Sequence, residues 1–251
     1  MTHNEYQLTI IVPVYNEAEC LPRFKQEMDQ YISLTPIPSK ILFVNDGSND
    51  GSLEIIKDIC HHHEDYYFVS LERNCGLSTA IKTGIDLCET RYIGYIDADL
   101  QTSPLDFLKY FQYLDSYCLI NGIRAKRNDS LIKKLSSKIA NAFRRLMIND
   151  GIQDTCCPLK IMETNVAKQL PFFKGMHRFI PALVQLKGCT VKQIEVQHFP
   201  RYAGTAKFHL FNRLVGPFLD TLVFVWMRKK NIRYKISEFE LIHEREQLVH
   251  E

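Results

Sequence analysis

Several common functional patterns are missing from this sequence of 251 residues. Its 8 cysteines form no C-x-x-C pair, which argues against a structural zinc site. Neither G-x-G-x-x-G nor a Walker A sequence occurs, which disfavours dinucleotide-dependent oxidoreductases and P-loop enzymes. A formal net charge of +2 gives no overall reason to expect nucleic acid as a partner. The function must therefore be sought in local clusters of residues.

Long apolar runs are scarce as well. No run reaches the roughly 18–20 apolar residues that a membrane span needs, and the nearest, residues 214–227, contains Pro217 and Asp220. Arg213 precedes this run and three basic residues, 228–230, follow it. The pattern predicts either a helix lying at a membrane surface or a core helix with charged ends. The N-terminus enters an apolar run without a signal peptide, so we expect reduced thiols and a cytoplasmic protein.

The sequence alternates between strand and helix patterns. Apolar runs typical of strands occupy residues 7–14, 40–44, 67–71 and 92–96, and amphipathic segments separate them. Further strands are expected at 118–123, 159–162 and 190–197, and helices at 130–146 and 176–186. This order predicts an α/β fold, with a mostly parallel sheet and helices on both faces. Right-handed crossovers would bring residues 15–17, 46–48, 74–76 and 97–101 to one edge, where such sheets bind ligands.

The segment after the fourth predicted strand carries the most chemistry. Asp97, Asp99 and Gln101 alternate along an extended stretch, so their side chains can point to one side. Such oxygen ligands suit a hard divalent cation, Mg²⁺ or Mn²⁺, that also holds phosphates. Ser103 then predicts the N-cap of a helix, with Asp106 placed as in a capping box. An acidic turn that only caps this helix is the alternative interpretation.

Seven short motifs follow one another along the chain. They are 11–17 (IVPVYNE), 44–48 (VNDGS), 73–76 (RNCG), 97–101 (DADLQ), 121–124 (NGIR), 154–155 (DT) and 201–207 (RYAGTAK). In this order they resemble the family 2 glycosyltransferases of the GT-A fold. The resemblance is strongest to dolichol-phosphate mannose synthases and bacterial polyprenyl-phosphate glycosyltransferases, and it covers roughly residues 7–210.

The resemblance implies an enzyme that uses a nucleotide sugar together with Mg²⁺ or Mn²⁺. Asp99 and Gln101 would hold the metal, and Asp97 would face the nucleotide end of the donor. The other positions that the resemblance assigns to the nucleotide sugar are Pro13, Tyr15, Glu17, Val44, Asp46, Ala98, Arg201 and Lys207. The last two are cations of a loop expected to close on the diphosphate. The second motif departs from the family's usual Asp-Asp-Gly-Ser, because Asn45 stands in place of the first aspartate.

The acceptor decides whether a general base is needed. A hydroxyl must lose a proton as it attacks, and Asp154 is the candidate base. A polyprenyl phosphate is already anionic, so cations that position it matter more. The resemblance assigns Arg124 to the lipid phosphate, and the basic segment that includes Lys133 and Lys134 could add to it. Cys156 replaces a glycine that is frequent in the family, next to the candidate base.

Our leading hypothesis is a catalytic domain at residues 1–210, followed by interfacial or packing helices and a tail at 211–251. The enzyme would transfer a hexose, with inversion, from a GDP- or UDP-sugar to undecaprenyl or dolichyl phosphate. The reaction would take place at the cytosolic face of a membrane, in the synthesis of cell-envelope glycans. One alternative is a glycosyltransferase that acts on a hydroxyl of a glycan or glycolipid, and another is a non-catalytic sugar-nucleotide-binding protein. The tail could also serve a homodimer.

Overall fold

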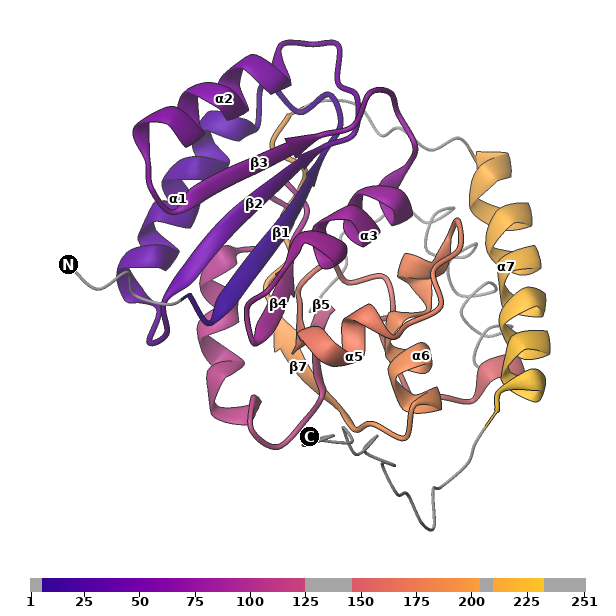
Figure 1. The fold of residues 1–251 in the computed structure, drawn as a ribbon. Helices are drawn as coiled ribbons and strands as arrows, with labels where there is room; N and C mark the ends of the chain where they lie inside the picture. The colour runs from indigo at the N-terminus through magenta and orange to yellow at the C-terminus, as the bar shows by residue number, and fades with distance from the viewer. Residues whose placement is uncertain (1–5, 125–145, 204–209, 233–251) are drawn as a thin grey trace, which may run out of the picture.

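Seven strands form one sheet in the computed structural model, which describes residues 6–124, 146–203 and 210–232 (Figure 1). The strands are β1 (Leu8–Val14), β2 (Ser39–Asn45), β3 (Tyr66–Ser70), β4 (Tyr92–Tyr95), β5 (Leu119–Arg124), β6 (Lys160–Glu163) and β7 (Val191–Val196). Their order across the sheet is β3-β2-β1-β4-β6-β5-β7. Strand β6 runs antiparallel to β4 and β5, and the other neighbours pair in parallel. The predicted mostly parallel sheet is confirmed.

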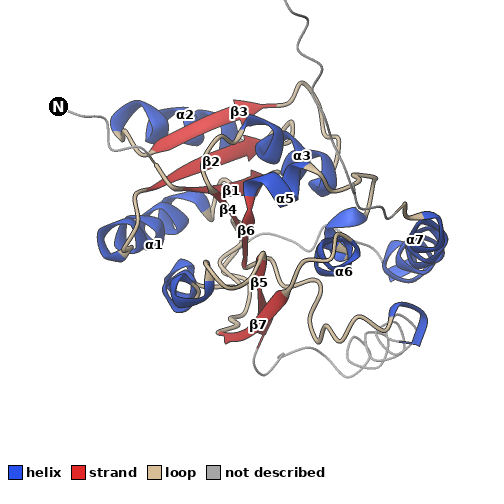
Figure 2. Ribbon diagram, turned by 60° about the horizontal axis from the view of Figure 1, so that its bottom comes forward, coloured by secondary structure: helices blue, strands red, loops and turns tan. Residues whose placement is uncertain are grey.

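Helices cover both faces of this sheet (Figure 2). They are α1 (Leu21–Leu34), α2 (Ser52–His62), α3 (Leu77–Leu87), α5 (Thr164–Lys168), α6 (Ile180–Leu186) and α7 (Leu210–Lys230), with short 3₁₀ turns η1 (Pro104–Lys109), η2 (Phe111–Tyr113) and η3 (Met176–Arg178). Alternate residues of β1 enter different cores, since Ile10 packs with α1 and α2 while Ile11 packs with α3 and α6. The layered α/β architecture therefore follows from strands that are apolar on both sides.

Two local predictions in the second half need correction. Ser103 does act as an N-cap, accepting a hydrogen bond from the Leu105 N–H at 3.3 Å, but the segment that it caps is the 3₁₀ turn η1. Asp106 closes no capping box, because its buried carboxylate accepts from the N–H of Gln197 at 2.7 Å, just after β7. The helix predicted at 176–186 is divided into η3 and α6. The helix predicted at 130–146 falls almost wholly outside the described residues.

Helix α7 lies along one edge of the molecule, beside α6 (Figure 1). The ring of Phe224 stacks on Phe179 with 5.3 Å between ring centroids, and Arg228 donates to the carbonyl of Met147 at 3.0 Å. Across the described parts of the chain, no helix combines the length and the apolar character needed to cross a membrane.

Candidate active site

A pocket of about 750 Å³ opens at the carboxyl ends of β1, β2 and β4. All four predicted turns contribute to its lining: Tyr15 and Glu17 after β1, Asp46 after β2, residues 74–76 after β3, and residues 97–99 after β4. Pro13 and Ala98 line it as well. This is the edge at which open α/β sheets bind ligands. The predicted convergence of the four turns is confirmed.

Asp97 and Asp99 place two carboxylates side by side in this pocket. Asp97 accepts a hydrogen bond from the hydroxyl of Tyr95 at 2.6 Å, and Asp99 accepts from the Gln101 N–H at 3.2 Å. Burial, reinforced by the nearby charge of Asp99, raises the pKa of Asp97. Burial also raises the pKa of Asp99, against the opposing effect of Arg201. Both carboxylates would therefore be stabilised by a cation in the pocket.

Arg201 supplies one positive charge at this place. Its guanidinium donates to Asp99 Oδ2 at 2.9 Å and to Glu17 Oε1 at 3.2 Å. The arginine thus bridges the turn after β1 and the turn after β4 across the pocket. The loop that carries it is held at a second point, where Arg23 of α1 lies 4.7 Å from the ring centroid of Tyr202. The expected cation of the 201–207 motif is brought to the predicted carboxylates.

The carboxylates fit a divalent cation by charge and donor type, since Mg²⁺ is commonly held by one or two carboxylates plus substrate phosphates. Gln101 is not among the described residues that line the pocket, so its role as a metal ligand stays a prediction. Its backbone carbonyl accepts from the N–H of Phe199 at 2.9 Å. Within residues 6–124, 146–203 and 210–232, no three His, Cys, Asp or Glu side chains form a ready-made metal site. Asp99, the other predicted ligand, does line the pocket, and its role as a metal ligand also stays a prediction.

Asp46 organises the next turn. Its two carboxylate oxygens accept from the N–H groups of Cys75 and Gly76 at 2.7 and 2.8 Å, at the start of α3. Gly47 makes this close approach possible: its φ is +65°, and a Cβ there would lie 2.6 Å from the backbone nitrogen of Asn74. Asp46 lines the pocket with both oxygens already engaged. Val44, which was assigned to the nucleotide, is fully buried in the core and does not line the pocket.

Arg124 and Asp154 form a separate, bidentate ion pair. Arg124 Nε and one terminal nitrogen donate to the two Asp154 oxygens at 2.7 and 2.8 Å, and both side chains are about nine-tenths buried. Neither residue lines the 750 Å³ pocket. The structure therefore joins the candidate base and the candidate phosphate cation to each other. Their assigned roles stay predictions, and Lys133, Lys134 and Lys207 lie outside the described residues.

The model of the family described as glycosyl transferase family 2 matches residues 9–170, more than half of the chain. The chain belongs to glycosyl transferase family 2. The motifs that carry the resemblance from 11–17 to 154–155 fall inside this match.

Curated relatives extend the match beyond the family model. The chain is 30% identical over 217 residues to the undecaprenyl-phosphate 4-deoxy-4-formamido-L-arabinose transferase of Pectobacterium atrosepticum, covering 86% of this chain and 66% of that protein. It is 30% identical over 231 residues to the dodecaprenyl-phosphate galacturonate synthase of Rhizobium johnstonii, covering 89% and 68%. This family 2 chain thus spans about two thirds of the length of the relatives that it matches.

Solved structures agree on the fold. Glucosyl-3-phosphoglycerate synthase from Mycobacterium tuberculosis, solved with Mn²⁺, UDP-glucose and phosphoglyceric acid, superposes with a TM-score of 0.63 at 13% identity, covering 91% of this chain and 81% of that one. Mannosyl-3-phosphoglycerate synthase from Rubrobacter xylanophilus gives a TM-score of 0.66 at 12% identity, covering 94% and 79%. The expected GT-A fold is confirmed.

Part of the pocket lining was missed by sequence reasoning. These residues are Ser78 at the start of α3, Lys174 before η3, His177 and Arg178 in η3, and Asp220 of α7. Only Asp220 gave a signal, as a lone carboxylate inside an apolar run. It pairs with Arg178 at 3.1 Å. The others stand in no motif, and their place depends on how the second half of the chain packs.

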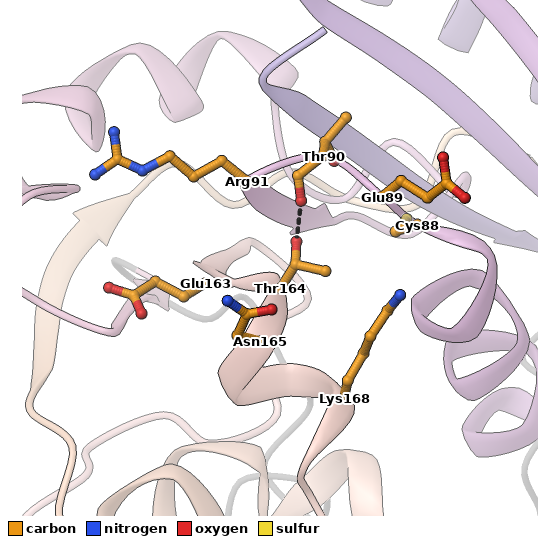
Figure 3. Close-up of a pocket in the computed structure, with 8 residues that line it drawn as sticks. All are labelled: Cys88, Glu89, Thr90, Arg91, Glu163, Thr164, Asn165 and Lys168. Atoms are coloured by element: carbon orange, nitrogen blue, oxygen red, sulfur yellow. Dashed lines mark hydrogen bonds between the residues drawn. The ribbon is translucent and has the colours of Figure 1, made fainter. Parts of the chain in front are cut away.

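A second pocket, of about 330 Å³, lies at the other end of β4, before the strand begins. Figure 3 shows its lining, which consists of residues 88–91, Glu163 at the end of β6, and Thr164, Asn165 and Lys168 of α5. Thr164 crosses it by donating to the carbonyl of Thr90 at 2.5 Å (Figure 3). The predicted site residues do not reach this end of the molecule. It is therefore separate from the candidate active site.

Proposed function

We propose that this protein is a metal-dependent glycosyltransferase that moves a sugar, with inversion, from a nucleotide sugar to a polyprenyl phosphate. The observation that carries the proposal is the meeting of Asp97, Asp99 and Arg201 in the pocket at the strand ends. The names of the two relatives support the acceptor class, since both specify a polyprenyl phosphate. The hexose expected from the sequence stays a prediction, because those names specify an arabinose derivative and a galacturonate.

The roles proposed for the carboxylates and for Arg201 follow from the charge of the leaving group. Departure of a nucleoside diphosphate builds up negative charge, and a bound divalent cation would stabilise that charge. Asp97 and Asp99 would hold the cation, while the turns at Tyr15 and Asp46 would border the nucleoside. In the structure Arg201 spans Glu17 and Asp99. Once these carboxylates have other partners, the same guanidinium is placed to contact the diphosphate.

The state of Asp154 favours a phosphate acceptor over a hydroxyl. A general base must be able to take up a proton, and a bidentate guanidinium stabilises the charged carboxylate against protonation. Both Asp154 oxygens are engaged by Arg124 in this way. A phosphate acceptor that is already anionic needs no such base. Transfer to a glycan hydroxyl would require the ion pair to open first.

A lipid acceptor requires contact with a bilayer, and α7 offers a surface for it. Five large apolar side chains are 40–63% exposed on this helix: Phe218, Leu219, Leu222, Val223 and Trp226. Their spacing places them on one arc, and the exposed Lys229 and Lys230 extend that arc at its C-terminal end. Apolar residues with tryptophan and lysine suit a helix lying on an anionic membrane surface. We propose that residues 211–251 serve this attachment at the cytosolic face.

A transfer assay tests the proposed function. Radiolabelled UDP-glucose, UDP-galacturonate and GDP-mannose are incubated with undecaprenyl or dolichyl phosphate, with and without Mn²⁺ or Mg²⁺. We expect organic-soluble glycolipid only with metal, and a loss of about 100-fold in kcat for Asp99→Asn and for Arg201→Ala. Arg23→Ala is the control: Arg23 contacts Tyr202 in the same loop but does not line the pocket. Its kcat should stay within about twofold of the wild-type value.

Two results would contradict the proposal. One is glycolipid formation that is equal in wild type and Asp99→Asn. The other is transfer to a hydroxyl acceptor but to neither lipid phosphate, with that activity abolished by Asp154→Asn. The second result would replace the phosphate acceptor by a glycan and would make Asp154 the base. Failure of all donors to react or to be hydrolysed would leave the non-catalytic alternative.

A further inference from the structure

The pocket that Asp97 and Asp99 line also holds a histidine that the proposed chemistry does not use. His177 lies in η3, and its Nδ1 is 2.8 Å from the hydroxyl oxygen of Ser78 on α3. The same hydroxyl oxygen accepts a hydrogen bond from the N–H of Gly175 at 3.1 Å. Both His177 and Ser78 line the pocket. One serine thus joins two elements of the wall and orients the imidazole.

We assign the tautomer of the ring from these contacts. The Ser78 oxygen accepts from the N–H of Gly175, and its hydroxyl proton can be donated to the Nδ1 of His177. In that arrangement Nδ1 is the acceptor of the neutral ring, and its proton lies on Nε2. Nε2 has no hydrogen-bond partner among the described residues. It is not among the buried polar atoms that lack a partner, so it keeps some contact with solvent, and His177 lines the pocket.

The ring stays neutral in this setting. Burial, with the positive charges of Arg178 and Lys160, lowers the pKa of His177 to about 3. Near neutral pH the residue therefore presents an uncharged N–H donor to the pocket. Its neighbour Arg178 is already committed to Asp220 at 3.1 Å. Gly175, at φ +95°, lets that carboxylate approach so closely that a Cβ would overlap it. The wall is thus fixed by contacts on both sides of His177.

The other parts of the pocket divide the donor among themselves. The turns at Tyr15, Asp46 and residues 74–76 border one part, and Asp97, Asp99 and Arg201 gather the charges that suit a diphosphate. The sugar follows the diphosphate in a nucleotide sugar, so we assign to the sugar the remaining lining, which also carries Lys174 and the Arg178–Asp220 pair. Within this lining the neutral N–H of His177 suits a hydroxyl oxygen.

We propose that His177 is a specificity-determining residue, whose Nε2–H donates a hydrogen bond to one hydroxyl oxygen of the donor's sugar. Ser78 is the positioning residue that holds the ring in the required tautomer. The inference rests on the proposed function and deepens it, since it names the group that distinguishes one sugar from another. A site that hydrogen-bonds a substrate oxygen discriminates strongly against analogues that lack it.

A double-mutant cycle between the protein and the sugar tests this assignment. The better donor of UDP-glucose and GDP-mannose is compared with its 2-, 3-, 4- and 6-deoxy analogues by kcat/KM, in wild type and in His177→Phe. In wild type, the kcat/KM of one analogue should be about tenfold lower than that of the parent donor. In His177→Phe, the kcat/KM of the parent donor should fall about tenfold. The same analogue should then react with the variant as well as the parent does. His177→Gln, whose amide N–H can reach the position of Nε2, should recover part of the loss.

Bare nucleotides separate a sugar contact from a structural effect. The dissociation constants of UDP and GDP, measured with Mn²⁺, should stay within about twofold in His177→Phe, because a contact to the sugar leaves the nucleotide untouched. The inference is overturned if nucleotide binding weakens in step with kcat/KM. It is also overturned if, at every sugar position, the loss of kcat/KM caused by His177→Phe and the loss caused by the deoxy analogue are additive in free energy. If His177→Phe does not fold, Ser78→Ala takes its place in the cycle. This variant keeps the imidazole but removes the hydroxyl that orients it.

The failure of this inference can be told apart from failure of the proposed function. If wild type turns over a donor but the cycle shows no coupling between His177 and a sugar hydroxyl, the transferase proposal stands and the role proposed for His177 is wrong. If wild type turns over none of the nucleotide sugars with either lipid phosphate, the transferase proposal falls, and the inference falls with it.

Discussion

Arg201 connects two carboxylates, Glu17 and Asp99, that are distant in the sequence but line the same pocket. Its two contacts, to Glu17 at 3.2 Å and Asp99 at 2.9 Å, offset part of the repulsion among buried carboxylates. The side chain is only about a quarter exposed, so the two ion pairs are screened less than surface pairs. An arginine held in this way keeps the site charged and assembled before a ligand arrives.

His177 gives a pH dependence of stability whose direction is fixed by its pKa. The native ring binds a proton near pH 3, whereas in the unfolded chain it does so near pH 6.5. Between these values the unfolded state binds more protons, so the free energy of unfolding falls as the pH falls. We expect wild type to lose stability relative to His177→Gln below about pH 6.5, by at most about 1.4 kcal/mol per pH unit.

Urea unfolding of both proteins from pH 8 to pH 5 measures this difference. Above about pH 7 the two stability curves should run parallel, because the ring is neutral in both states there. Curves that remain parallel down to pH 5 would show that the imidazole is not enclosed as the structure describes.

At the scale of elements, the turn between β2 and α2 depends on one close backbone approach. Gly47 and Gly51 both have positive φ, +65° and +88°. A Cβ on Gly47 would lie 2.6 Å from the Asn74 backbone nitrogen, whereas a Cβ on Gly51 would meet nothing within 4 Å. Gly51→Ala should therefore cost about 1 kcal/mol of conformational strain, and Gly47→Ala about 1–3 kcal/mol more.

Denaturation curves give the free energy of unfolding of both variants. Because the strain of a positive φ is common to both, the difference between them measures the clash with the Asn74 backbone. Gly47→Ala should also weaken UDP and GDP binding, because the 73–76 segment that must shift lines the pocket. Equal stability of the two variants would mean that this segment is not packed against the turn.

Strands were predicted to within one or two residues because each is a short apolar run bounded by polar turns. The antiparallel direction of β6 could not be predicted, since side-chain pattern carries no strand direction. The break between η3 and α6 had a local cause in Pro181, which lacks an N–H and stands in the first turn of α6. The 3₁₀ form of η1 goes with the tertiary partner of Asp106, the N–H of Gln197, which the sequence did not reveal.

Helix α7 should bring the protein to membranes through its exposed apolar arc. Trp226→Ala should lower the partition coefficient onto vesicles of phosphatidylcholine and phosphatidylglycerol by about tenfold, because the lost apolar contact is worth about 1.5–3 kcal/mol. Leu87→Ala is the matched control and should partition like wild type, since Leu87 is 56% exposed on α3 and is not part of the arc. Co-sedimentation measures both. Equal partitioning of wild type and Trp226→Ala would contradict the surface proposed for α7.

At the scale of the whole molecule, the two walls of the pocket differ in how well the sequence predicts them. Asp97 and Asp99 could be placed because parallel strands end at one edge and the turns after them must meet. Ser78, His177 and Asp220 could not, because η3 and α7 are brought to the pocket by tertiary packing such as the Phe179–Phe224 stack. Arg124 and Asp154 were expected at an acceptor but proved to be paired with each other.

The proposed function requires the pocket at the strand ends to bind a divalent cation together with a nucleoside diphosphate. Titration calorimetry of UDP and GDP, with and without Mn²⁺, tests it in wild type and in Asp99→Asn. We predict that at least one nucleotide binds wild type, that Mn²⁺ tightens this binding by tenfold or more, and that Asp99→Asn abolishes the metal-dependent part. Nucleotide binding that is the same with and without Mn²⁺, or unchanged in Asp99→Asn, would contradict the account.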